Sequence, residues 1–143
     1  MSKPRRSHIK RTVNPMAVRL SEPELVQFML RPHVHLSLLL SEGRPNPLYL
    51  SSIIGIFNVA MALAYMHKDI RSIHLYESIQ RPLLEVATVG ISTPELGQRL
   101  RRVFTIADRY ISAQAKADLL RAIRLVEHEL AHGNENDLLH AER

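Results

Sequence analysis

The sequence predicts an all-α, single-domain protein in which five or six helices form a bundle around one central apolar helix. Three observations support this prediction. Leu48 to Met66 runs for nineteen residues without a charge, and a helix that is apolar all round must be covered on most sides. Capping signals and helix-ending glycines divide the rest of the chain into segments of helical length. In those segments the apolar residues recur at helical spacing, without strand-like alternation.

The composition is that of a globular protein with a neutral body and a basic start. The chain has 143 residues, 45% of them hydrophobic, and no cysteine. Disulfides, thiolate chemistry and sulfur-ligated zinc sites are therefore excluded, and we expect no cofactor. Five of the 19 lysines and arginines lie in the first eleven residues. In the rest of the chain, 14 basic residues balance 14 acidic ones. A neutral body is not typical of a nucleic-acid footprint.

Residues 1–20 are predicted to form a flexible basic arm, because prolines and charge repulsion oppose a helix there. Two interpretations of the arm stay open. It contacts nucleic acid or an acidic partner electrostatically, or it is a solvated tail. We expect the helical domain over residues 21–133 and a polar tail over 134–143. The candidate contact residues of the arm are Lys3, Arg5, Arg6, Lys10 and Arg11.

The helical domain is predicted to begin with a capping box at Ser21-Glu22-Pro23-Glu24, in which Ser21 and Glu24 each bond the other's backbone N–H. We expect a short helix to follow, and Arg31-Pro32 to interrupt it, since the residue before proline avoids helical geometry. A second short helix then starts at Pro32, and Gly43 ends it.

The central helix has a start signal at Asn46-Pro47 and a stop signal at His67-Lys68-Asp69. Its length is at the lower end of what a bilayer requires. It carries Asn58, two serines and Gly55, and no other segment is comparable. We therefore interpret it as a buried core helix, and we expect no membrane contact and a cytoplasmic protein.

Three further helical segments are predicted. Asp69 caps the first, which Gly90 ends and in which Pro82 predicts a kink near residues 79–81. Ser92-Thr93-Pro94-Glu95 is a second capping signal, and the helix after it carries one apolar face through Ile111. We expect Ser112 to cap the last helix, which runs to Gly133.

Two patterns suggest nucleic-acid binding. The helix after Pro94 carries Arg99, Arg101 and Arg102, which would bind an acidic surface or form a solvated face. Residues 60–79 loosely follow the order of a helix-turn-helix, but the turn lacks glycine and Pro82 cuts the second helix. DNA binding through the basic arm and the arginine-bearing helix is therefore an alternative function.

The segment His128-Glu129-Leu130-Ala131-His132 matches the H-E-x-x-H pattern of zinc peptidases. Catalytic zinc needs a third protein ligand, and none occurs at a familiar spacing in the eleven residues after His132. Both histidines also lie roughly 160° from the middle of the predicted core stripe of that helix. We therefore expect no catalytic residues and no enzyme. A zinc-dependent hydrolase stays open as an alternative, with His128 and His132 as the metal candidates.

Several motifs together resemble one group of proteins. They are the basic start, Asn14-Pro15, Leu20-Ser21-Glu22-Pro23-Glu24 and Asn58-Val59-Ala60-Met61-Ala62-Leu63-Ala64. This combination is similar to small helical proteins of proteobacterial chromosomes and mobile elements, some of which are labelled Fis-like transcriptional regulators. The resemblance implies a regulatory role. It supplies no site residues, and the chain lacks a Fis-like C-terminal helix-turn-helix.

A chain of this size rarely encloses an all-round apolar helix, so we expect a homodimer. The predicted interface residues are Ile54, Phe57, Asn58 and Met61, with Asn58 placed to pair with its own symmetry mate. The leading functional hypothesis is a non-enzymatic cytoplasmic interaction protein, a regulator that acts by binding an unidentified protein.

Overall fold

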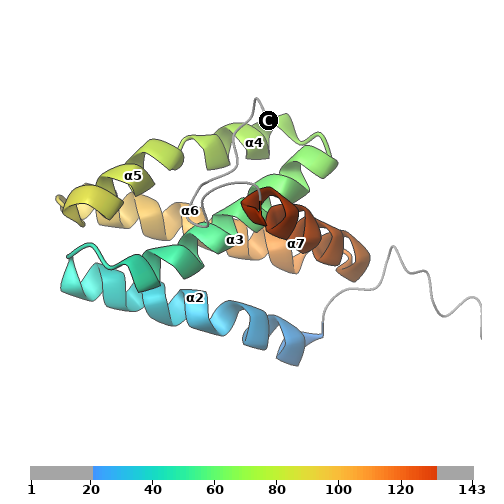
Figure 1. Ribbon diagram of the computed structural model, residues 1–143, viewed down its shortest axis with the longest axis horizontal. Coiled ribbons are helices and arrows are strands. Elements are labelled where there is room, and N and C mark those ends of the chain that lie inside the picture. Colours follow the sequence, from blue (N-terminus) through green and yellow to red (C-terminus); the bar gives the residue numbers. More distant parts are fainter. Residues whose placement is uncertain (1–20, 132–143) are drawn as a thin grey trace, which may run out of the picture.

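The computed structural model describes residues 21–131, which form six helices and no strand (Figure 1). The all-α prediction is confirmed. The predictions made for the arm and the polar tail lie outside these residues. The helices are α2 (Glu22–Glu42), α3 (Pro47–Met66), α4 (Ile70–Glu77), α5 (Gln80–Val89), α6 (Pro94–Ser112) and α7 (Lys116–Ala131). Helix α3 is central and contacts each of the other five.

Helix α2 begins with the predicted capping box. The backbone N–H of Ser21 donates to Glu24 Oε1 at 2.9 Å, and the backbone N–H of Glu24 donates to Ser21 Oγ at 3.3 Å. These bonds satisfy donors that a helix start otherwise leaves open. The helix ends at Gly43, which takes the left-handed conformation with φ 75°.

The predicted interruption of α2 at Arg31-Pro32 is wrong, because one continuous helix runs through Pro32. Proline there cannot donate to the carbonyl of Phe28, four residues earlier. The ring is nevertheless buried together with Met29 and Leu36 on the face that packs against α3. Burial of this apolar face outweighs the lost hydrogen bond, and tertiary packing overrides the local preference.

Helix α3 starts where the sequence predicts. Asn46 Oδ1 accepts from the backbone N–H of Leu48 at 3.0 Å, and Pro47 occupies the first helical position. At the other end Lys68 adopts φ 54°, and the N–H of Asp69 donates to the carbonyl of Ala64 at 2.9 Å. This is the Schellman closure that normally uses glycine.

The middle of α3 is enclosed by the chain itself, since every residue from Ile56 to Ala64 is buried. Among the described residues α3 alone is long and apolar enough to span a membrane, and 67% of its apolar window is buried inside the fold. A buried core helix of a soluble protein passes the same test. This placement corrects the predicted dimer interface. Ile54, Phe57, Asn58 and Met61 are 8%, 2%, 1% and 2% exposed.

A second copy cannot reach those four side chains while the bundle is closed. The prediction rests on one chain leaving its apolar helix partly open, whereas α3 contacts five other helices of the same chain. The homodimer itself stays a prediction, and it needs another surface.

The predicted kink near residues 79–81 is a break between two helices. Helix α4 ends at Glu77, Ser78 and Ile79 form a turn, and α5 starts at Gln80. Pro82 then lies in the first turn of α5, where a missing N–H is tolerated. The two helices follow one another along one side of the bundle (Figure 1).

Helix α6 has the predicted apolar face, with Leu100, Val103, Phe104 and Ala107 buried. Thr93 Oγ1 caps it by accepting from the N–H of Leu96 at 3.1 Å. The prediction that Ser112 caps the last helix is wrong. Ser112 is the last residue of α6, its hydroxyl donates to the carbonyl of Asp108 at 2.8 Å, and α7 starts at Lys116.

Candidate protein-binding groove

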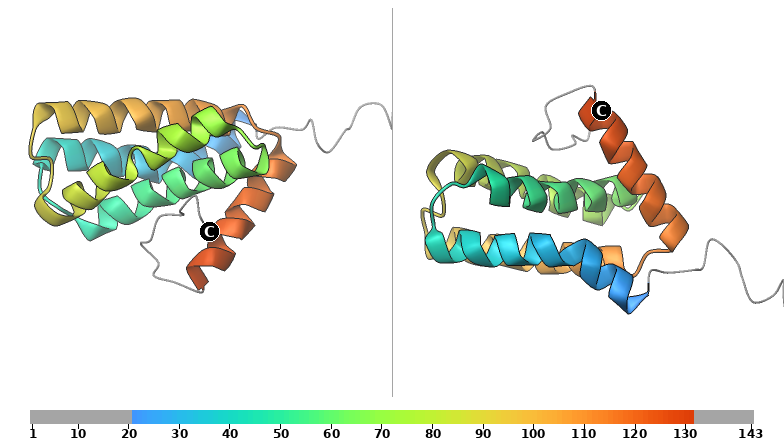
Figure 2. Two further views of the ribbon diagram at one scale, coloured as in Figure 1. Left: turned by 90° about the horizontal axis from the view of Figure 1, so that it is seen from above. Right: turned by 60° about the horizontal axis from the view of Figure 1, so that its bottom comes forward.

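Helices α2 and α7 form the walls of a groove whose floor is α3. The two walls begin close together, where Lys116 Nζ donates to Glu24 Oε2 at 2.9 Å. From that point α7 diverges from α2 (Figure 2), so the groove widens along α3. Its volume is about 470 Å³, within the range of protein ligand pockets.

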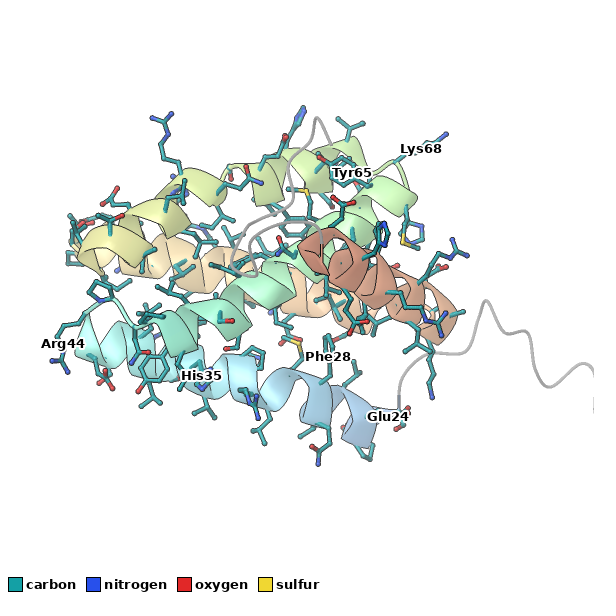
Figure 3. The ribbon with its side chains drawn as sticks, viewed as in Figure 1. Glu24, Phe28, His35, Arg44, Tyr65 and Lys68 are labelled. Carbon is teal, nitrogen blue, oxygen red and sulfur yellow. The ribbon has the colours of Figure 1, made fainter. Side chains whose placement is uncertain are left out.

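The groove is apolar inside and polar at its rim. Phe28 extends from α2 toward α7 (Figure 3), and Arg31 lies on the same wall. Glu127 belongs to the opposite wall, on α7. The apolar lining consists of Phe28, Pro32, Ile56, Val59, Ile123 and Val126.

Gly55 lies in the floor of the groove, and no contact among the described residues requires a glycine at this position. A Cβ built on Gly55 meets no described atom within 4 Å. Gly97 of α6 shows the contrast, because a Cβ there would lie 3.3 Å from Ile91 Cγ2. Packing within the chain therefore explains Gly97 and leaves Gly55 unexplained. A glycine inside a helix lowers stability by about 0.5–1 kcal/mol relative to alanine.

Polar contacts fix α2 at both ends of the groove. At the narrow end the Lys116 ammonium, together with the backbone N–H of Ser21, holds the pKa of Glu24 below its usual value. Further along α2, His35 Nδ1 lies 2.6 Å from Ser52 Oγ on the floor helix. Burial lowers the pKa of His35, and the nearby charge of Arg31 lowers it further, so both effects favour the neutral imidazole.

A second apolar surface lies on the side of α2 that faces away from the core. Val26, Leu30, Val34 and Leu38 follow one another at four-residue intervals and are 55%, 54%, 47% and 38% exposed. We call these four residues the outer ridge. A run of apolar side chains at this spacing forms the type of ridge by which helices pack against one another.

The three arginines predicted to contact an acidic partner do not form one patch. Residues 99 and 101 point roughly 200° apart around α6. Arg99 donates from Nη2 to the backbone carbonyl of Ser78 at 2.9 Å, a contact within the fold. Arg101 and Arg102 are exposed. The five basic candidates of the arm lie outside the described residues, so DNA binding stays a prediction.

The zinc-peptidase pattern is only partly described. His128 is exposed on α7, and Glu129 is half-buried. His132 lies outside the described residues. Within residues 21–131, no three histidine, aspartate or glutamate side chains come together as a metal site. A zinc hydrolase therefore stays a prediction without support from this part of the chain.

Sequence reasoning missed the groove residues Arg31, Gly55 and Glu127. One local signal was present, namely a glycine in the middle of an otherwise bulky apolar helix. The outer ridge also had a signal, because residues 22–42 carry apolar side chains on two opposite faces. The position of α7, which creates the groove, has no such signal.

No family model, curated protein or solved structure matches the chain. The resemblance to small helical proteins of proteobacterial chromosomes and mobile elements therefore stays a prediction.

Proposed function

We propose that the protein is a non-enzymatic cytoplasmic interaction protein, with a regulatory role, that binds another protein in the groove between α2 and α7. The observation that carries the proposal is Gly55. It weakens the central helix, its open side faces the groove, and no described side chain occupies that space. A backbone exposed in this way suits close approach by a partner.

The side chains that line the groove support the binding of a partner protein. The walls present aliphatic and aromatic side chains, whereas Arg31, Gln27 and Glu127 are exposed at the rim. An apolar centre with a polar rim is the usual organisation of a protein interface. Of the apolar lining residues, Phe28 and Ile123 are half-buried, whereas the other four are already buried by the chain itself. A partner therefore removes apolar surface from water mainly at Phe28 and Ile123, at about 25 cal/mol for each Å².

The proposal is tested by site-specific crosslinking in the native host. A photo-crosslinking amino acid at Gln27, on the groove rim, is compared with the same amino acid at Thr105, exposed on α6. We expect an adduct with one defined protein from position 27 and none of that protein from position 105. Gly55→Met, which fills the floor, is expected to abolish the adduct.

Ala87→Met is the matched control, because it places the same side chain at an exposed position of α5 that does not line the groove. Circular dichroism and the unfolding midpoint show whether both variants are folded. An adduct that forms equally from both positions, or one that persists in folded Gly55→Met, contradicts binding in the groove.

A further inference from the structure

We infer that the groove takes a single amphipathic helix with a small residue over Gly55, an acidic edge toward α2 and a basic edge toward α7. The inference rests on the proposed function and adds the chemistry of the partner. Three features of the groove lead to it, namely its helical walls, its glycine floor and its opposite charges.

The helical walls determine the secondary structure of the partner. The groove lining comes entirely from α2, α3 and α7, and backbone groups inside helices already bond one another. An extended peptide over this apolar floor would leave its own N–H and C=O groups without partners, which is costly. A helix satisfies its backbone internally and presents side chains only, as in other helix-in-groove complexes.

The glycine floor determines the size of the residue that faces it. Interaxial distances between packed helices are roughly 8–10 Å and depend on the side chains at the contact. Gly55 contributes no side chain, and a Cβ there meets no described atom within 4 Å. A partner helix with glycine, alanine or serine at the crossing point therefore reaches the lower end of that range.

The charges determine the edges of the partner helix. Arg31 lies on the α2 wall and Glu127 on the α7 wall, and both are exposed. Among the described residues neither forms an ion pair, whereas Glu24 and Lys116 at the narrow end neutralise each other. Opposite charges on the two walls favour a helix with the complementary charge on each edge, and they set its direction.

Three synthetic peptides test the inference directly. Each has about 18 residues, or five helical turns, with a leucine face and one central alanine. The first carries glutamates on one edge and lysines on the other, the second glutamates on both edges, and the third lysines on both. Binding to the full chain is measured by fluorescence anisotropy. We expect the mixed peptide to bind about two- to fivefold more tightly than either of the others, the range of exposed charge pairs.

Charge variants must then change the preference in a defined direction. Glu127→Arg makes both walls basic and should favour the all-glutamate peptide. Arg31→Glu makes both walls acidic and should favour the all-lysine peptide. Arg102→Glu on α6, outside the groove, is the matched control and should leave the order unchanged.

Each other outcome overturns the inference in a recognisable way. If all three peptides bind equally and Gly55→Met abolishes binding, the groove binds protein but the charge pattern is wrong. If no peptide binds while position 27 crosslinks to a protein in cells, the partner is not such a helix. If the crosslink joins two copies of this chain, the occupant is a second copy. If neither peptides nor crosslinks are found, the proposed function fails as well.

Discussion

Arg99 of α6 donates a hydrogen bond from Nη2 to the backbone carbonyl of Ser78, at 2.9 Å. The carbonyl lies four residues before Pro82, which has no N–H to donate to it. A side chain from a neighbouring helix thus supplies the donor at the break between α4 and α5.

Arg99→Ala should lower the free energy of unfolding by about 1 kcal/mol, because the carbonyl of Ser78 loses this donor. Arg102→Ala, also on α6 and exposed, should stay within about 0.5 kcal/mol of wild type. Urea denaturation measures both. Equal effects of the two substitutions would show that the hydrogen bond to Ser78 does not contribute to stability.

Gly55→Ala should raise the free energy of unfolding by about 0.5–1 kcal/mol, because alanine favours the helix and the new methyl group meets no described atom. Gly97→Ala in α6 is the matched control. Its Cβ would lie 3.3 Å from Ile91 Cγ2 and 3.4 Å from Leu40 Cδ2, so it should gain less or lose stability. A loss of stability in Gly55→Ala would mean that the space above Gly55 is filled.

Tyr76→Phe should leave stability unchanged or raise it by up to about 1 kcal/mol. Tyr76 is 1% exposed, and its hydroxyl has no hydrogen-bond partner among the described residues, so its removal abolishes a desolvation penalty. Tyr110→Phe is the control, because the Tyr110 hydroxyl bonds Asp69, the residue that caps α4. The free energy of unfolding of that variant should fall by about 1 kcal/mol. A similar fall in Tyr76→Phe would reveal a hydrogen-bond partner of the Tyr76 hydroxyl.

Stability should fall as the pH rises above 10. Burial, with the charge of Asp69 adding to it, raises the pKa of Tyr110 to about 12, whereas tyrosine in an unfolded chain ionises near 10. Between these values the unfolded state has lost the proton and the folded state has kept it, so each increase in pH favours unfolding. For Tyr110 alone we expect a loss of roughly 1–2 kcal/mol between pH 10 and 12, after allowance for solvent screening. Burial also raises the pKa of Tyr76, so this second hydroxyl adds to the loss.

Denaturant midpoints at pH 9, 10 and 11 measure the slope of stability against pH. In Tyr110→Phe the slope should become smaller, because the titrating hydroxyl is absent. A wild-type midpoint that is constant up to pH 11 would contradict the buried environment of this hydroxyl.

If the chain forms a homodimer, the outer ridge is the surface we expect it to use. Identical ridges at four-residue spacing interdigitate in the commonest class of helix packing. Leu30→Glu with Val34→Glu should convert the dimer to a monomer, as measured by light scattering after size exclusion. Leu84→Glu, at an exposed leucine of α5, should leave the dimer intact. A wild-type chain that is monomeric at high concentration would refute the dimer prediction.

The elements with local signals were predictable from the sequence. The Ser21 capping box, the Asn46-Pro47 start and the glycine end at Gly43 are each set by a few consecutive residues. The apolar face of α6 follows from helical spacing alone. These features depend little on the rest of the chain.

Two of the wrong predictions, the interruption at Pro32 and the dimer interface on α3, depend on tertiary contacts. Pro32 continues α2 because its ring is buried against the core, a contact that no local rule contains. Phe57 and Asn58 are enclosed by their own chain because five helices reach α3. The groove exists because α7 diverges from α2, which depends on long-range contacts. Gly55 was visible in the sequence, but its significance depends on that geometry.

The central claim is that the open floor at Gly55 binds a partner helix. The most direct measurement is the dissociation constant of the crosslinked partner segment, made as a peptide, for wild type, Gly55→Met and the control Ala87→Met, which should bind like wild type. We predict that Gly55→Met binds at least about 100-fold more weakly than wild type, roughly 2.7 kcal/mol, with an unfolding midpoint no lower than that of wild type. Equal dissociation constants for wild type and a folded Gly55→Met would contradict the claim.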